Sequence, residues 1–347
     1  MKKQSGLAAL ALIGLVEGLL TGCGGGGSQA TTQRYAAYIL TSPLYSSKTT
    51  GVAIVNGVCV GNYVTTEGTN SVSWMGVATQ PTGHNVIAIN ATDGVNFVGW
   101  AKLRDNPARL ASFETGGLFK SSLNPAGYFS SEARGMAGTQ QVGSGQLTEQ
   151  AQPHALLWFG TAESVIDLNP SAFTGSVAYS TDGATQVGSA TNAANQTHAA
   201  LWSGSAATLV DLNPTIAVAS VAFAISGGQI VGSVDTHAFL WNGSAGSTVD
   251  LHPSGFNSSV AKGMNSIAGK QVGYGFNTSS GPGASIKHAL VWSGTASSSV
   301  DLEQFLPAGY SGSTAAGIDS FGNIIGSANF AGTSTAILWV PISNQSQ

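Results

Sequence analysis

The feature that most constrains the fold of this chain is an internal repeat. The pattern His-Ala-x-x-Trp occurs four times, and an Asp-Leu pair follows each copy. The four copies and their pairs begin at His154 and Asp167, His198 and Asp211, His237 and Asp250, and His288 and Asp301. Self-similarity of this kind marks solenoids, propellers and other arrays of one small unit. The chain is therefore expected to fold as a series of similar modules.

Weaker copies extend the repeat toward both ends. Trp74, Phe113 and Trp339 take the Trp position in three further units. Every unit also contains a glycine preceded by Val or Ile, and these glycines lie 38 to 53 residues apart. They are Gly61, Gly99, Gly143, Gly188, Gly232, Gly273 and Gly326. The landmarks predict seven units.

Each unit holds four short strand candidates separated by Gly, Ser, Asn and Asp, which favour turns. In the fourth unit these candidates are Ser176–Ser180, Gln186–Ala190, His198–Trp202 and Val210–Leu212. Four strands and one Trp in about 40 to 50 residues are typical of a propeller blade. The sequence thus predicts an all-β, seven-bladed β-propeller of four-stranded blades over residues 34–341, followed by a C-terminal tail at 342–347.

The two ends of the repeat are offset in a way that favours a closed ring. The last unit stops at 336–341 and lacks a fourth strand, whereas an extra strand candidate, Tyr35–Leu40, precedes the first unit. We expect this N-terminal strand to complete the last blade, which removes exposed sheet edges. An open solenoid would instead end in capping repeats.

The repeated His and Asp are predicted to serve each other. They are separated by 13 residues in all four units that contain them, and the other three units lack both. Antiparallel pairing without a bulge would place His154 directly opposite Asp167. We interpret the pairs as structural hydrogen bonds between packed blades. Metal binding and catalysis are the alternatives.

The N-terminus has the features of a secretion signal. Two lysines precede an apolar run over residues 7–20, and Leu-Thr-Gly-Cys at 20–23 ends it. A basic head, a short apolar stretch and small residues are typical of a secretory signal. The four residues resemble the bacterial lipobox, which implies a signal peptide at 1–22, a lipid on Cys23 and a Gly-rich tether over 23–33. With Gly24 after the Cys, the resemblance implies an outer-membrane lipoprotein of the bacterial cell envelope. A plain signal peptide is the alternative.

One repeat carries a family resemblance. His-Ala-Phe-Leu-Trp at 237–241, the Val-Asp-Leu that follows it and the recurring Gln-x-Val-Gly resemble the HAF family of bacterial extracellular repeats. The resemblance covers about residues 35–341 and is strongest over 140–326. It implies a secreted or surface protein, and the family carries no established biochemical activity.

Composition and motifs narrow the function classes. Charged residues make up 8% of the chain, and its formal net charge is −4. No cluster of Lys and Arg is present, which excludes nucleic acid as a partner. The sequence lacks the common hydrolase, zinc and calcium motifs, so no catalytic residue, metal or cofactor is predicted. Cys59, between two valines, is interpreted as a small core residue.

A ligand site is expected on the face that carries the loops after the second strand of each unit, because these loops vary. They span 100–108, 144–153, 189–197, 233–236, 274–287 and 327–335. Residues that depart from the repeat, or lie in these loops, are the candidates for ligand binding: Trp100, Lys102, Arg104, Asp105, Asp235, His252, Lys287 and Glu303.

These features predict a monomeric, lipid-anchored binding module whose partner is a glycan, an envelope component or a protein. The alternative is a glycan-acting lyase or hydrolase with its site in the central funnel. A hydrolase would need two carboxylates within about 10 Å of each other. The irregular acids that could supply them are Asp105, Glu149, Asp235 and Glu303.

Overall fold

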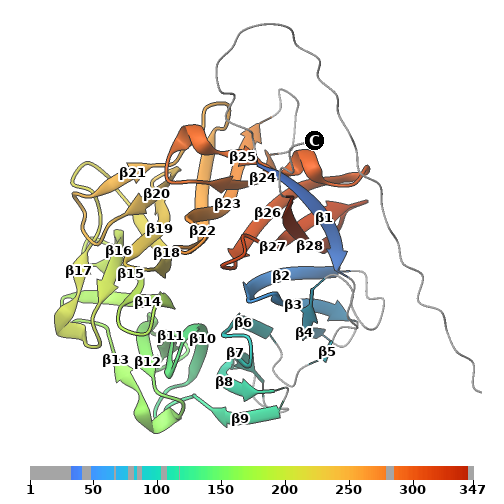
Figure 1. The fold of residues 1–347 in the computed structure, drawn as a ribbon. Coiled ribbons are helices and arrows are strands. Elements are labelled where there is room, and N and C mark those ends of the chain that lie inside the picture. Colours follow the sequence, from blue (N-terminus) through green and yellow to red (C-terminus); the bar gives the residue numbers. More distant parts are fainter. Residues whose placement is uncertain are drawn as a thin grey trace, which may run out of the picture.

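The fold is a ring of seven four-stranded antiparallel sheets, which confirms the predicted seven-bladed β-propeller (Figure 1). The computed structural model describes residues 33–40, 48–65, 68–76, 82–83, 88–102, 108–116, 118–278 and 285–342. The signal peptide, Cys23, Arg104 and Asp105 lie outside this part of the chain. Within it, no helix has the length and apolar character needed to span a membrane.

The strands follow one another from the centre of the ring outward in each of the first six blades. Blade 1 holds β2 (Lys48–Val55), β3 (Val58–Thr65), β4 (Gly68–Met75) and β5 (Thr82–Gly83). Blade 2 holds β6 (Ala88–Thr92), β7 (Asn96–Ala101), β8 (Leu110–Thr115) and β9 (Leu118–Ser122). Blade 3 holds β10 (Ser130–Ala137), β11 (Gln140–Gln146), β12 (His154–Trp158) and β13 (Ile166–Asp167).

The remaining blades continue this order. Blade 4 holds β14 (Phe173–Thr181), β15 (Gln186–Asn192), β16 (Thr197–Trp202) and β17 (Val210–Asp211). Blade 5 holds β18 (Ser220–Ser226), β19 (Gln229–Val234), β20 (His237–Trp241) and β21 (Thr248–Asp250). Blade 6 holds β22 (Ser258–Asn265), β23 (Lys270–Thr278), β24 (Ser285–Trp292) and β25 (Val300–Asp301). Four 3₁₀ turns are η1 (Ala162–Ser164), η2 (Ala206–Thr208), η3 (Ala296–Ser298) and η4 (Leu302–Phe305).

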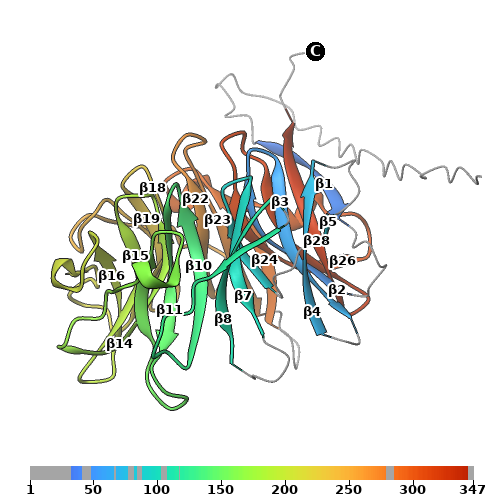
Figure 2. The same cartoon turned by 90° about the horizontal axis from the view of Figure 1, so that it is seen from below.

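The N-terminal strand closes the ring, as predicted. Blade 7 consists of β26 (Tyr310–Ile318), β27 (Ile324–Phe330), β28 (Thr333–Ile342) and β1 (Arg34–Leu40). β1 pairs antiparallel with β28, from Arg34 opposite Ile342 to Leu40 opposite Ala336. Figures 1 and 2 both show β1 beside the C-terminal strands. The two ends of the repeat are therefore joined by seven residue pairs.

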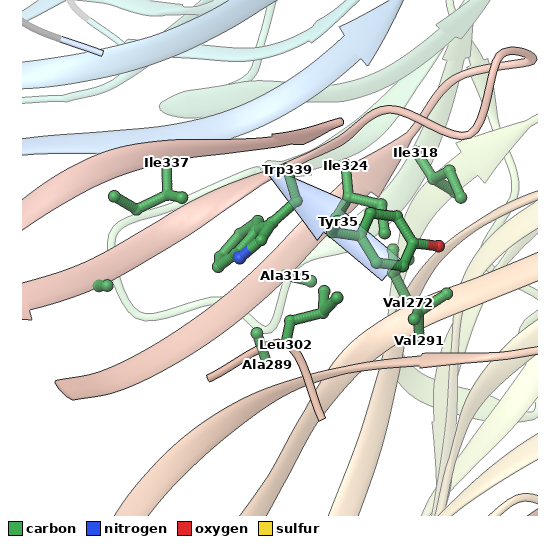
Figure 3. Close-up of a cluster of buried hydrophobic side chains, with 11 residues drawn as sticks. Tyr35, Val272, Ala289, Val291, Leu302, Ala315, Ile318, Ile324, Ile337 and Trp339 are labelled. Carbon is green, nitrogen blue, oxygen red and sulfur yellow. The ribbon is translucent and has the colours of Figure 1, made fainter. Parts of the chain in front are cut away.

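Apolar layers between neighbouring blades hold the ring together. Figure 3 shows the layer where blades 6 and 7 meet, in which Trp339 and Leu302 pack with Tyr35 of the closing strand. The repeated Trp side chains are buried in such layers, with at most 3% of their surface exposed, and Cys59 is fully buried. Burial raises the pKa of the Cys59 thiol to about 12. This cysteine is thus a core residue, as predicted.

The repeated His and Asp form a hydrogen-bonded pair in each of blades 3 to 6. The His Nδ1 and Asp Oδ2 atoms lie 2.7–2.8 Å apart in all four. The predicted register is wrong, because Asp167 lies opposite Leu156 and reaches His154 as a diagonal neighbour. The pairs join the third and fourth strands of one blade rather than two neighbouring blades, and 17–39% of each His and 34–48% of each Asp side chain is exposed.

A polar contact that does join neighbouring blades is made by a buried Ser or Thr on the inner strand. Its hydroxyl oxygen accepts a hydrogen bond from a backbone N–H on the third strand of the preceding blade, as Ser176 does from Ala155 at 2.9 Å. The same contact occurs at five more interfaces, at Ser131, Ser220, Ser259, Ser313 and Thr49. In the fourth blade the Ser176 hydroxyl donates to Asn169, so each serine joins two blades and the connecting loop.

Two predicted ligand residues belong to this serine network. His252 takes the place of the Asn, with Nδ1 2.9 Å from the Ser259 hydroxyl. Its ring also stacks on that of His237, with centroids 3.9 Å apart. The carboxylate of Glu303 accepts hydrogen bonds from the backbone N–H of Gly312 and from Ser313. Both side chains are therefore held by the scaffold.

The loops after the second strands are shorter than predicted. β15 and β23 extend into the ranges assigned to loops, which leaves residues 193–196 and 279–284 between the strands. Asp235, in another of these loops, accepts hydrogen bonds from the backbone N–H groups of Val218 and Ala219. Its carboxylate fixes a turn of the propeller.

Candidate functional site

A β-bulge interrupts every inner strand at the same point of the repeat. At this point of each inner strand one residue is left out of the pairing with the second strand, between two paired neighbours. β14 and β26 have a further irregularity nearer their start. A bulge of this kind redirects a side chain. The seven bulge residues are Val52, Asn90, Arg134, Tyr179, Phe223, Lys262 and Ala316, and all seven line one central cavity of about 750 Å³. We call this cavity the central channel.

The repeated glycine exists because of this bulge. Gly188 lies opposite Ala178, next to the bulge at Tyr179. A Cβ atom on Gly188 would lie 1.9 Å from the Val177 carbonyl oxygen, and the corresponding distances at all seven landmark glycines are 1.8–2.0 Å. No side chain can occupy such a position without moving the backbone. The Val-Gly or Ile-Gly landmark of the sequence therefore marks where a channel residue is placed.

Four adjacent blades supply a continuous run of cationic and aromatic bulge residues. The Arg134 guanidinium lies 5.5 Å from the ring centroid of Tyr179. The Tyr179 and Phe223 rings are 5.3 Å apart, tilted by 57°. The Lys262 Nζ lies 3.4 Å from the Phe223 centroid. These are cation–π and aromatic contacts, so the run holds two cations on an aromatic support, and one of them, Arg134, also pairs with Glu132.

A third cation lies on the same wall. Lys287 Nζ is 4.9 Å from the ring centroid of Tyr274, and both residues line the central channel. Burial, and to a smaller extent the positive charges of Arg134 and Lys287, lower the pKa of Lys262 to about 8. The three cations are therefore close enough to repel one another, which a bound anion would relieve.

Asp319, which lines the channel, and Glu132, which lies beside the channel next to Arg134, already accept hydrogen bonds. Glu132 accepts hydrogen bonds from Arg109 and Arg134, each at 3.1 Å, and from Asn90 at 2.9 Å. Asp319 accepts from the backbone N–H of Gly57 and from the turn around Asn323. Among the described residues of the channel, the cations exceed the acids that could neutralise them.

A second, smaller hollow of about 400 Å³ lies on the face predicted to bind ligands. Its lining includes Arg109, Glu132, Gln146 and Pro153, and it shares Arg134 with the central channel. Trp100, a predicted ligand residue, lies under the Arg109 guanidinium at 4.6 Å. Arg134 thus lies between two cavities. The smaller hollow opens on the face that carries the loops after the second strands, and the central channel extends to the turns between the first and second strands on the other face.

The predicted ligand residues are dispersed. Lys287 lines the central channel and Trp100 supports the edge of the second hollow, whereas Lys102 is an exposed residue at the end of β7. Sequence reasoning missed Arg134, Tyr179, Phe223 and Lys262. The signal that could have found them is the residue after Ser-x-Ala, the position where an otherwise regular unit differs in every copy.

No group of three or more His, Cys, Asp or Glu side chains is placed to hold a metal ion in the part of the chain that the structure describes. The described channel is lined by cations, aromatic rings and amides. It suits a ligand that carries both negative charge and flat apolar surface.

The comparisons with known proteins support the fold alone. No family model and no curated protein matches the chain. A mutant puromycin hydrolase in complex with PGG is similar at 11% identity and a TM-score of 0.54, over 83% of this chain and 52% of that one. The chain thus spans about half the length of that structure. A GH32 β-fructofuranosidase of Bombyx mori aligns at 10% identity and a TM-score of 0.30, over 90% and 92% of the two chains.

Proposed function

We propose that the chain is a lipid-anchored binding module of the bacterial cell envelope, related to the HAF repeat proteins, whose central channel binds an acidic saccharide. The observation that carries this proposal is the run of Arg134, Tyr179, Phe223 and Lys262 on four adjacent inner strands. The outer-membrane anchor through Cys23 is part of the same proposal.

Each component of the run matches a part of an acidic sugar. A guanidinium donates two parallel hydrogen bonds to a carboxylate, and an ammonium adds a second positive charge. Aromatic faces such as that of Phe223 offer flat apolar surface to a sugar ring, and the amide of Asn90 lies on the same ring of bulges. A cavity of about 750 Å³ falls within the range of small-ligand sites. A short segment of a uronic-acid glycan combines these properties.

The hydrolase alternative has less support. Retaining and inverting glycosidases commonly use a pair of carboxyl groups, one of which protonates the leaving oxygen. Glu132, beside the described channel, is held by two arginines, and Asp319, which lines the channel, is held by a turn. Of the irregular acids, Glu149 is exposed, whereas Asp235 and Glu303 bind backbone N–H groups of the scaffold. The cationic channel favours binding.

Isothermal titration of the protein with trigalacturonate tests the proposal, with galactotriose as the neutral counterpart. We expect trigalacturonate to bind and the neutral sugar to bind far more weakly. Arg134→Met should lower the affinity about tenfold or more, because a hydrogen bond between charged groups is worth about 1.5–3 kcal/mol. Arg134→Lys, which keeps the charge, should retain part of the affinity.

Lys270→Met is the matched control, because Lys270 lies outside the channel and binds Ser293. Thermal melts of each variant separate loss of binding from loss of folding. Failure of the wild-type protein to bind trigalacturonate would overturn the proposal. Equal losses in Arg134→Met and Lys270→Met would show that the channel is not the site.

A further inference from the structure

We infer that the central channel also cleaves its ligand by β-elimination, with Lys262 as the base that removes a proton from a uronic-acid residue. The inference rests on the proposed function, since the substrate is the same class of acidic saccharide. The inference goes beyond binding, because it assigns a reaction and gives a separate role to each of two side chains. Arg134 would hold the carboxylate, and Lys262 would take the proton.

The surroundings of Lys262 are those of an activated amine. Its Nζ faces the Phe223 ring at 3.4 Å, in a channel wide enough to admit a ligand. Burial and two neighbouring cations lower its pKa to about 8, so a substantial fraction of the amine is unprotonated in mildly alkaline conditions. Desolvation and a cationic neighbour are the two means by which proteins activate lysine.

The other charged and titratable groups of the channel are less suited to take a proton. These groups are Arg134 on β10 with its ion-pair partner Glu132, Tyr179 on β14, Tyr274 and Lys287 in blade 6, and Asp319 after β26. An arginine stays protonated in proteins. Burial raises the pKa of Tyr274, which keeps its proton. Glu132 and Asp319 are held by the donors described above. Tyr179 packs its ring between Arg134 and Phe223, and Lys287 lies on β24, outside the run of bulge residues. Lys262 is therefore the base that the geometry assigns.

The reaction needs no oxidant and no second substrate. In a 4-linked uronic acid the proton on C5 is acidified by the adjacent carboxylate, and pairing that carboxylate with a cation acidifies it further. The unprotonated Lys262 Nζ takes the C5 proton, the electron pair forms the C4=C5 double bond, and the C4–O bond breaks. The leaving oxygen receives a proton from water, and Lys262 returns its proton to solvent. The products are an unsaturated uronate end and a new reducing end.

The test follows the ultraviolet absorbance of the new double bond when the protein is incubated with polygalacturonate, alginate or hyaluronan. We expect the wild-type protein to generate the unsaturated product from at least one of the three. Its rate should rise with pH as Lys262 loses its proton near pH 8. Lys262→Arg should lower the rate about a hundredfold or more, the usual contribution of a general base. Lys270→Met should change nothing.

Lys262→Arg keeps the positive charge, so it separates catalysis from binding. Retained affinity for trigalacturonate with lost turnover would support the division of roles. A wild-type protein that binds trigalacturonate and forms no double bond with any of the three polymers would overturn the elimination and leave the binding proposal standing. Loss of both binding and product would overturn both. Equal turnover in wild type and Lys262→Arg would exclude Lys262 as the base.

Discussion

Gly188→Ala should destabilise the propeller strongly, although it adds only one methyl group. The new Cβ would lie 1.9 Å from the Val177 carbonyl oxygen and 2.9 Å from the Ala178 Cα. Those atoms belong to backbone on either side of a pairing position, so strand β15 must move by on the order of 1 Å to relieve the overlap. Overpacking commonly costs about 1–3 kcal/mol. Because the obstacle is backbone, we expect about 3 kcal/mol.

Urea denaturation followed by circular dichroism measures this loss, and thermal melts should show a lower Tm by on the order of 6 °C. Gly246→Ala is the matched control, because no atom lies within 4 Å of its added Cβ. It should change the free energy of unfolding by at most about 0.5 kcal/mol. If Gly188→Ala were as mild as Gly246→Ala, the bulge would not be the reason for the repeated glycine.

Three further outcomes are expected. Ser220→Ala should lower the free energy of unfolding by about 2 kcal/mol in urea denaturation, because it leaves the buried Ala199 N–H without its acceptor. Asp211→Ala should lower it by about 1 kcal/mol only, because the carboxylate is half-exposed and water can take its place. Equal losses would contradict the conclusion that the serine contact stabilises the ring more than the His–Asp pair does. Lys262→Met should raise Tm at pH 7, since the folded pKa of about 8 lies below the ordinary 10.5 and charging Lys262 therefore opposes folding. That gain is present in full below pH 8 and shrinks as the pH rises toward 10.5, so a gain independent of pH would refute it. Cys23→Ser should move the protein from the membrane to the soluble fraction of lysed cells, and unchanged membrane association would exclude the lipid anchor.

The architecture was predictable because it depends on features that repeat. Seven glycines and seven aromatic landmarks count the blades, and the surplus strand at Arg34–Leu40 fits the strand missing after Trp339. The register of the His–Asp pairs was not predictable from spacing. In blades 3 to 6 the Asp lies opposite the residue two positions after the His, both where a 3₁₀ turn such as η1 joins the two strands and in blade 5, where none does. Asp167 consequently reaches His154 along a diagonal.

The channel escaped prediction for the opposite reason, because its residues differ in every blade. Val52, Arg134 and Ala316 share a backbone position and nothing else. A bulge is a property of strand pairing, so the only sign of it in the sequence is the glycine that accommodates it. The prediction relied instead on variable loops and on residues that depart from the repeat. Two of the latter, His252 and Glu303, complete the serine network.

The position of a bound acidic sugar tests the central claim most directly. A crystal structure of the protein soaked with trigalacturonate should show a carboxylate of the sugar within hydrogen-bonding distance of the Arg134 guanidinium and a sugar ring against Phe223. A trisaccharide bound on the loops after the second strands, with the central channel empty, would contradict the account.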